Sequence, residues 1–76
     1  MINMRKEEVY NLLEQYESKL VLGHYTYVID GCFLVKTKEH MYFGNAIIHY
    51  SETIKLISIA DNKIYEIPIS QITEIN

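Results

Sequence analysis

Residues 21–37 read VLGHYTYVIDGCFLVKT, and this stretch decides the fold that the sequence predicts. β-branched and aromatic residues dominate it, which favours extended strands over helices. Asp30-Gly31 stands between two apolar runs, and two-residue hairpin turns with positive φ angles favour that pair of residue types. We therefore expect a strand over residues 21–29, a tight turn, and a second strand over residues 32–37.

The same alternation of apolar runs and polar breaks continues to the end of the chain. Three polar segments predict turns, namely Lys38-Glu39-His40, Ser51-Glu52 and Asp61-Asn62. The runs between them predict strands over residues 41–50, 53–60 and 63–67. Because proline cannot donate a ladder hydrogen bond, Pro68 should break the fifth strand before a short last strand over residues 69–75.

An amphipathic helix should precede these strands. Asn3 suits an N-cap, and Glu7 and Glu8 would lie in the first turn, where the helix dipole favours acidic side chains. Apolar side chains then recur at the spacing of one helical face, at Val9, Leu12, Leu13, Tyr16 and Leu20. This pattern predicts a helix within residues 1–20 that ends at about Lys19 and buries one face.

Taken together, these elements predict an α+β fold in a single domain of residues 1–76, with one N-terminal helix and a five- to six-stranded antiparallel meander. A chain of 76 residues is the size of one small domain. Strongly twisted meanders tend to close because closure removes their unpaired edges. We therefore expect residues 21–76 to close into a small SH3/Sm-like barrel, with the helix over one end or face.

The layout from Phe33 to Ile75 resembles that of Sm-like proteins. The shared features are a strand and polar turn, a long bent strand with Gly44, a turn at Tyr50-Ser51-Glu52, two further strands, and a proline break before a short last strand. The resemblance implies a small barrel that assembles into a ring and binds RNA or a small nucleotide. The chain departs from the family where RNA is bound: it has Tyr50-Ser51-Glu52-Thr53 in place of an Asp and an Asn, and Tyr65-Glu66 in place of a basic pair.

Composition bounds the partners and the compartment. The formal charge is −3, from 7 basic and 10 acidic residues, so the long-range field disfavours nucleic acid as a partner. Cys32 is the only cysteine and lies in an apolar run, which predicts a buried, inert thiol in a reducing compartment. The sequence has neither a signal-peptide pattern nor a membrane-spanning run of roughly 18 apolar residues. We expect a cytoplasmic protein that does not contact a membrane.

The residue types that carry chemistry do not form a recognisable pattern. His24, His40 and His49 fall on separate predicted elements, with no cysteine or carboxylate at the spacing of metal ligands. The three glycines are isolated, so the sequence has no glycine-rich loop for phosphate. We therefore predict a non-enzymatic protein with no catalytic residues, no metal and no cofactor.

Seven tyrosines are the most unusual feature of the composition. Core packing and cross-strand pairing are the favoured interpretation of most of them, and a role in binding is the alternative for some. Tyrosine is also enriched at protein interfaces and stacks on nucleic-acid bases. Because acidic residues outnumber the few lysines of the β region, a protein is the favoured partner. The candidate binding residues are Tyr25 and Tyr27 on one face of the first strand, Tyr42 and Tyr50 on one face of the third, and Tyr65 in the fifth.

Two classes of function remain open at this point. The leading hypothesis is a small protein-binding module, an inhibitor or adaptor of bacterial or phage origin such as an anti-defence inhibitor. Self-association to a homo-oligomer is expected as well, since 49% hydrophobic residues in so short a chain leave apolar surface to cover. The alternative is an Sm-like ring that binds RNA or a small nucleotide. A structural subunit that pairs through an edge strand is a third interpretation.

Overall fold

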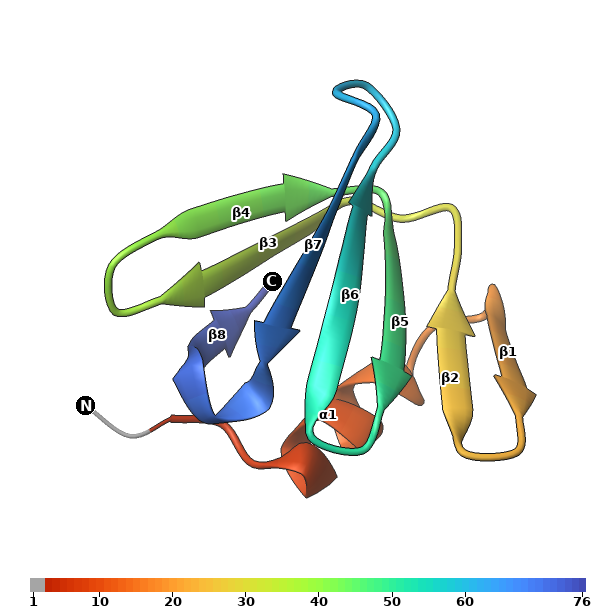
Figure 1. Ribbon diagram of the computed structural model, residues 1–76. Helices are drawn as coiled ribbons and strands as arrows, with labels where there is room; N and C mark the ends of the chain where they lie inside the picture. Colours follow the sequence, from red (N-terminus) through yellow and green to blue (C-terminus); the bar gives the residue numbers. More distant parts are fainter. Residues whose placement is uncertain (1–2) are drawn as a thin grey trace.

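The computed structural model describes residues 3–76, and Figure 1 shows one helix followed by short antiparallel strands. The predicted α+β class is confirmed. In chain order the elements are α1 (Lys6–Leu13), β1 (Lys19–Leu22), β2 (Tyr25–Val28), β3 (Phe33–Thr37), β4 (Met41–Gly44), β5 (Ala46–Tyr50), β6 (Thr53–Ser58), β7 (Lys63–Pro68), a 3₁₀ turn η1 (Ile69–Gln71) and β8 (Ile72–Ile75).

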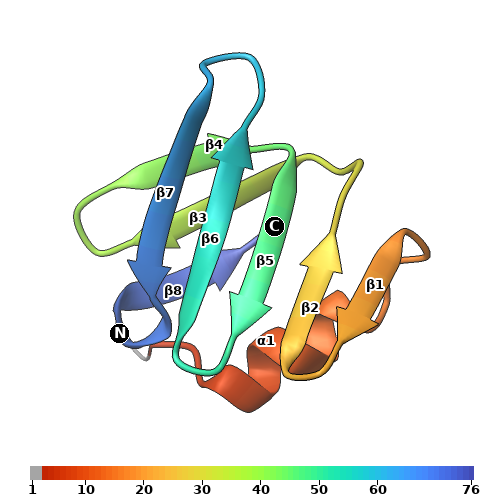
Figure 2. The ribbon, with the colours of Figure 1, turned by 45° about the vertical axis from the view of Figure 1, so that its right-hand side comes forward.

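The strands form two sheets rather than one closed barrel. Sheet A has the order β1-β2-β5-β6-β7, and sheet B has the order β4-β3-β8. In Figure 2, sheet A lies in front of sheet B and of α1. Within residues 3–76 no strand ladder joins the two sheets, so the prediction of a closed barrel of five or six strands is wrong.

The structure has more strands than the sequence predicts, and the first additional strand arises because the chain turns at Gly23. The predicted strand over residues 21–29 is in fact a hairpin, in which Leu22 pairs with Tyr25 across a two-residue loop. Gly23 has a φ of 61°, and glycine at the first loop position is typical of a type II′ hairpin turn. The hairpin that the sequence predicts at Asp30-Gly31 is therefore displaced to Gly23-His24.

Asp30 does adopt a positive φ, of 70°, but it does not close a hairpin. β2 pairs with β1 and β5, whereas β3 pairs with β4 and β8. The Asp30-Gly31 segment therefore carries the chain from sheet A to sheet B. The residue types predicted the positive φ of Asp30 correctly. They did not determine which strands β2 and β3 pair with, because that depends on contacts far apart in the sequence.

The predicted strand over residues 41–50 also divides, at Asn45, into β4 of sheet B and β5 of sheet A. A Cβ atom on Gly44 would overlap the Leu56 side chain, so glycine allows the chain to approach β6 closely at this corner. The Asn45 N–H donates to the Ile57 carbonyl oxygen at 2.7 Å. This corner connects the two sheets, as a bent strand does in the predicted barrel, but it does not close them.

Helix α1 begins later than the sequence predicts. Its N-cap is Arg5, whose N–H donates to the Glu8 carboxylate at 3.0 Å. Glu7 and Glu8 lie in the first turn, as predicted. The Asn3 side chain does not cap the helix, because its amide donates instead to the Ser70 carbonyl oxygen.

The helix also ends earlier, at Leu13 instead of about Lys19. The N–H groups of Gln15 and Tyr16 bond to carbonyl oxygens three residues back, at 3.3 and 3.2 Å, which tightens and ends the last turn. Lys19 then enters the ladder with β2, and Leu20 lies on an exposed strand rather than on the buried helix face.

The remaining turns match the sequence. The chain turns between β3 and β4, between β5 and β6 and between β6 and β7, with positive φ at Ser51 and Asn62. Pro68 ends β7 before η1, as expected for a residue without an N–H.

The core lies between the inner face of sheet A, sheet B and one side of α1. Its buried apolar residues are Val9, Leu13, Val28, Phe33, Val35, Ile47, Ile54, Leu56, Ile67, Ile69, Ile72 and Ile75. The helix contributes Val9 and Leu13, four residues apart on one face. Because sheet B and α1 both pack against the inner face of sheet A, no element within residues 3–76 covers the opposite face of that sheet (Figure 2).

Candidate binding surface

The uncovered face of sheet A collects three of the predicted tyrosines. Directly opposed residues of an antiparallel pair lie on the same face of a sheet. Tyr25 opposes Tyr50, and Tyr27 opposes Ile48, while the alternate residues of β2, Thr26 and Val28, are buried. We call the outer side of sheet A the tyrosine face, formed by Leu20, Leu22, Tyr25, Tyr27, Ile48, Tyr50, Thr53, Lys55 and Glu66.

The tyrosine rings of this face stack on one another. The Tyr25 and Tyr50 ring centroids lie 4.5 Å apart with an interplanar angle of 22°, and those of Tyr25 and Tyr27 lie 5.9 Å apart at 29°. Tyr25 and Tyr50 are each 43% exposed. Stacked rings lose little freedom when a partner covers them, so the three tyrosines form a preorganised aromatic platform.

A depression of about 280 Å³ lies in the tyrosine face. Tyr25, Tyr27 and Tyr50 line it together with Ile48, Thr53, Lys55 and Glu66. Lys55 and Glu66 are opposed across β6 and β7, so both signs of charge border the aromatic centre. A depression of this size suits one apolar side chain that projects from a partner. The charged residues at its border would then face polar groups around that side chain.

Tyr42 and Tyr65 lie elsewhere. Their ring centroids are 5.0 Å apart, and both side chains are half-buried and packed against the core. Tyr42 belongs to sheet B and Tyr50 to sheet A, so the prediction that they share one strand face is wrong. The division of the predicted strand at Asn45 is the reason. The five candidates therefore separate into an exposed group of three and a half-buried pair.

Sequence reasoning missed the aliphatic part of the face. Leu20 and Leu22 oppose Tyr27 and Tyr25 and extend the platform to the edge of the sheet. The helical spacing assigned Leu20 to the helix instead. Gly23-His24, between the runs Leu20-Val21-Leu22 and Tyr25-Thr26-Tyr27, was the signal for a hairpin that would have placed both leucines beside the tyrosines.

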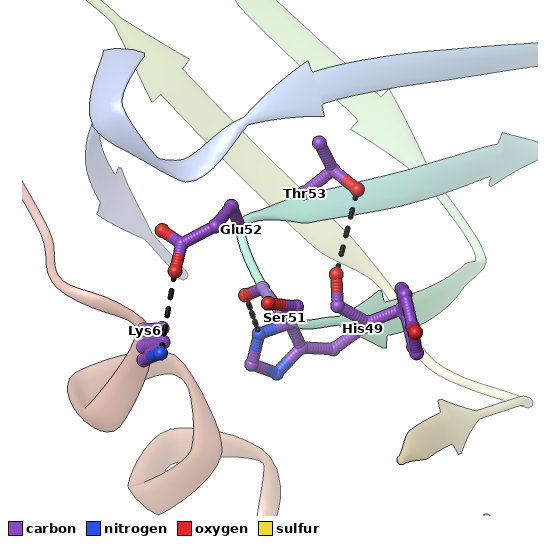
Figure 3. Close-up of polar contacts among 6 residues, drawn as sticks. Lys6, His49, Ser51, Glu52 and Thr53 are labelled. Carbon is purple, nitrogen blue, oxygen red and sulfur yellow. Dashed lines mark hydrogen bonds and ion pairs between the residues drawn. The ribbon is translucent and has the colours of Figure 1, made fainter.

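His49 supports the turn beside this face rather than offering a reactive group. Its ring is fully buried, lies 4.1 Å from the Tyr10 ring, and donates from Nε2 to the Ser51 carbonyl oxygen at 2.9 Å (Figure 3). Nδ1 has no hydrogen-bond partner among the described residues. Burial lowers the pKa of His49 below 6.5, against smaller raising effects of the Ser51 carbonyl and the Glu52 charge. The neutral ring therefore acts as a structural anchor of the β5–β6 turn.

An ion pair holds the same turn to the helix. The Lys6 ammonium lies 3.3 Å from the Glu52 carboxylate, and the Thr53 hydroxyl bonds to the Tyr50 carbonyl oxygen at 3.5 Å (Figure 3). Both charged side chains are well exposed, so the pair positions the turn without contributing much stability.

The other reactive residue types considered in the sequence do not come together among the described residues. Within residues 3–76, no three His, Cys, Asp or Glu side chains gather closely enough to hold a metal ion. Cys32 is exposed, so the prediction of a buried thiol is wrong: Cys32 precedes β3, and the neighbouring Phe33 takes the buried position. In the same range, no helix combines the length and apolar character that a membrane crossing requires.

No family model, curated protein or solved structure matches this chain. The likeness to Sm-like proteins therefore rests on the layout of strands and turns alone. The structure agrees with its coarse part, a small antiparallel β-rich domain with one helix.

Proposed function

We propose that this chain is a small non-enzymatic protein-binding module, an adaptor or inhibitor, and that the tyrosine face is its binding surface. The observation that carries the proposal is the ordered row of Tyr27, Tyr25 and Tyr50 at the centre of a sheet face that no other element of the described residues covers. Exposed, contiguous apolar surface with a polar border is the usual mark of an interaction site.

The residue types favour a protein over a nucleic acid. Lys55 is the one cation that borders the depression, and Glu66 opposes it directly. With a net charge of −3, the chain has little to offer a phosphate backbone. A protein surface with a projecting apolar side chain fits better, because tyrosine gives large contact area at low entropic cost.

The same argument bounds the kind of activity. A rigid face on a domain of 9.0 kDa can block a partner's own surface or join it to another protein, and these are the actions of an inhibitor and an adaptor. The bacterial or phage origin and the cytoplasmic location stay predictions from composition. The Sm-like ring that binds RNA has no specific support from this face.

The test is affinity capture with matched surface variants in extracts of the native host. The double variant Tyr25→Ser/Tyr50→Ser removes the platform, and Met41→Ser/Phe43→Ser removes a still more exposed apolar pair from β4 of sheet B. We expect a defined protein to be enriched by the wild type and by the β4 variant and lost from the tyrosine variant, with all three folded by circular dichroism. Enrichment of no protein, or equal capture by both variants, would contradict the proposal.

A further inference from the structure

The free edge of sheet A at β1 is unusually apolar. Leu20, Val21 and Leu22 are exposed by 52%, 51% and 54%, although successive residues of a strand point to opposite faces. Both sides of β1 are therefore open to solvent, and in the described chain no element lies beyond it (Figure 2). An edge strand also presents a row of unpaired N–H and C=O groups, which makes it a template for another strand.

Two of the three other sheet edges carry features that usually prevent pairing. The opposite edge of sheet A, β7, has Lys63, Glu66 and Pro68. At the β8 edge of sheet B, the Met4 N–H donates to the Ile72 carbonyl oxygen at 2.7 Å, which covers that strand with the N-terminal segment. The β4 edge of sheet B is apolar as well, and the bond from the Asn45 N–H to the Ile57 carbonyl oxygen holds the chain to β6 only just beyond the end of that strand.

The edge at β1 has none of these features. Its ladder with β2 runs without a register shift, so no bulge twists it away. Its one charge, Lys19, is already paired within the chain, since its ammonium lies 2.5 Å from the Glu14 carboxylate and bonds to the Glu14 carbonyl oxygen at 3.0 Å. β1 therefore has neither a feature that prevents pairing with another strand nor an unpaired charge.

The hairpin geometry identifies which main-chain groups are free. In a two-residue turn the flanking residues, here Leu22 and Tyr25, are hydrogen-bonded to each other. Because bonded and non-bonded pairs alternate along an antiparallel ladder, Leu20 also directs its N–H and C=O towards β2, and Val21 directs them outward. Pairing at this edge would centre on Val21.

We propose that β1 pairs antiparallel with β1 of a second copy of this chain, with Val21 opposite Val21 of the partner subunit on a two-fold axis. This inference goes beyond the proposed function and does not depend on it. Pairing of like edges closes on itself as a dimer, whereas pairing of β1 with β7 would continue indefinitely, and the charges and Pro68 of β7 oppose it.

Charge and register agree with a second copy as the occupant. In this register Leu20 meets the partner's Leu22 on the outer face, and Lys19 meets the partner's Gly23. The two Lys19 residues are then four positions apart along the strands, about 13 Å, which exceeds the Debye length of about 8 Å at physiological salt. The two tyrosine faces become continuous across a ten-stranded sheet.

The expected dimer exchanges with monomer. A ladder of about four residues, with the side chains beside it, falls below the roughly 1,200 Å² of a standard interface. We therefore expect the mass to rise with concentration towards twice 9.0 kDa, from micromolar to millimolar protein, and not to continue beyond two copies.

Sedimentation equilibrium on the wild type, Val21→Lys and Val21→Pro, with Met41→Lys as a control, tests the proposal. Val21→Lys places like charges opposite each other at the axis, and Val21→Pro removes an outward N–H without removing a bond to β2. Met41→Lys makes the same change of charge at the exposed edge strand β4. Dimerisation of only the wild type and Met41→Lys supports the proposal; a monomeric wild type, or dimerisation unaffected at Val21, overturns it.

Disulfide trapping tests the register and does not rely on variants that weaken the strand. In a Cys32→Ser background, Val21→Cys brings two thiols together on strands whose opposed Cα atoms would lie about 5.5 Å apart, within the range of a disulfide. Leu22→Cys is the control, because the two copies of that position lie diagonally, beyond about 7 Å. With oxidised glutathione as the oxidant, we expect a covalent dimer at position 21 and little at position 22; the reverse order overturns the register.

Discussion

The inner and outer faces of sheet A are made by alternate residues of the same strands, yet they differ in burial and in their main residue types. The inner face is mostly aliphatic and is buried, with Ile47, Ile54 and Leu56 fully covered beside the buried His49. The outer face is aromatic and open, with Tyr25 and Tyr50 stacked in solvent. Since burying an apolar side chain is the main source of stability, the inner face holds the fold together, and the outer face is free to serve another purpose.

The largest effect should come from the inner face. Leu56→Ala removes a fully buried side chain and should lower the free energy of unfolding by about 2–5 kcal/mol. Lys55→Ala, on the adjacent outer position, should change it by no more than about 0.5 kcal/mol. Urea unfolding followed by circular dichroism measures both; similar losses would show that the two faces do not differ as described.

The tyrosines allow a core-packed position and an exposed position to be compared with the same residue type. Tyr65→Ala removes a ring that packs on the core against Tyr42 and should destabilise the fold by about 2 kcal/mol. Tyr25→Ala removes an exposed ring and should cost less than about 1 kcal/mol, the contribution of its stacking. A larger loss at Tyr25 than at Tyr65, in the same unfolding assay, would reverse the assignment of the two groups.

The pH dependence tests the buried anchor beneath the outer face. Because burial lowers the pKa of His49 below 6.5, the unfolded chain gains a proton first as the pH falls below that value. The free energy of unfolding should then decrease, by at most about 1.4 kcal/mol per pH unit, until native His49 is protonated as well.

Unfolding of the wild type and of His49→Phe between pH 8 and about pH 5 measures this contribution. His24 and His40 are present in both proteins, so the difference between the two curves isolates His49. The variant should have the flatter curve below pH 6.5. Parallel curves would mean that the ring is not buried in its neutral form.

The smallest effect should come from the exposed ion pair of Lys6 and Glu52. Lys6→Ala should change the free energy of unfolding by no more than about 0.5 kcal/mol, and added salt should remove the difference. A change above 1 kcal/mol that persists in salt would mean that the pair is better shielded from water than its exposure indicates.

Much of the local structure could be predicted from residue patterns. The helix, the change to a period of two, most turns and the break at Pro68 follow from nearest-neighbour chemistry. The sequence placed Asp30 in a turn, and its φ is positive. What could not be predicted is which strands pair, because the Asp30-Gly31 and Asn45 corners obey long-range packing between the two sheets rather than local preference.

The candidate site could also be predicted only in part, because its residues come from strands whose pairing the sequence does not reveal. Alternation correctly placed Tyr25 and Tyr27 on one strand face, but joining them to Tyr50 required the pairing of β2 with β5. The separation of Tyr42 followed from the strand division at Asn45, where Gly44 approaches β6 closely and the Asn45 N–H donates to the Ile57 carbonyl oxygen. Residue type made the tyrosines candidates for binding, and topology determines which of them are accessible.

The most direct test of the central claim, that the tyrosine face binds a protein, is photo-cross-linking in cells of the native host. A benzophenone amino acid replaces Tyr25 in one variant and Phe43, an exposed aromatic residue of sheet B, in the other. We predict a cross-link from position 25 to a protein other than a second copy of the chain, and none of that mass from position 43. Cross-linking from position 43 alone, or to no other protein from position 25, would contradict the account.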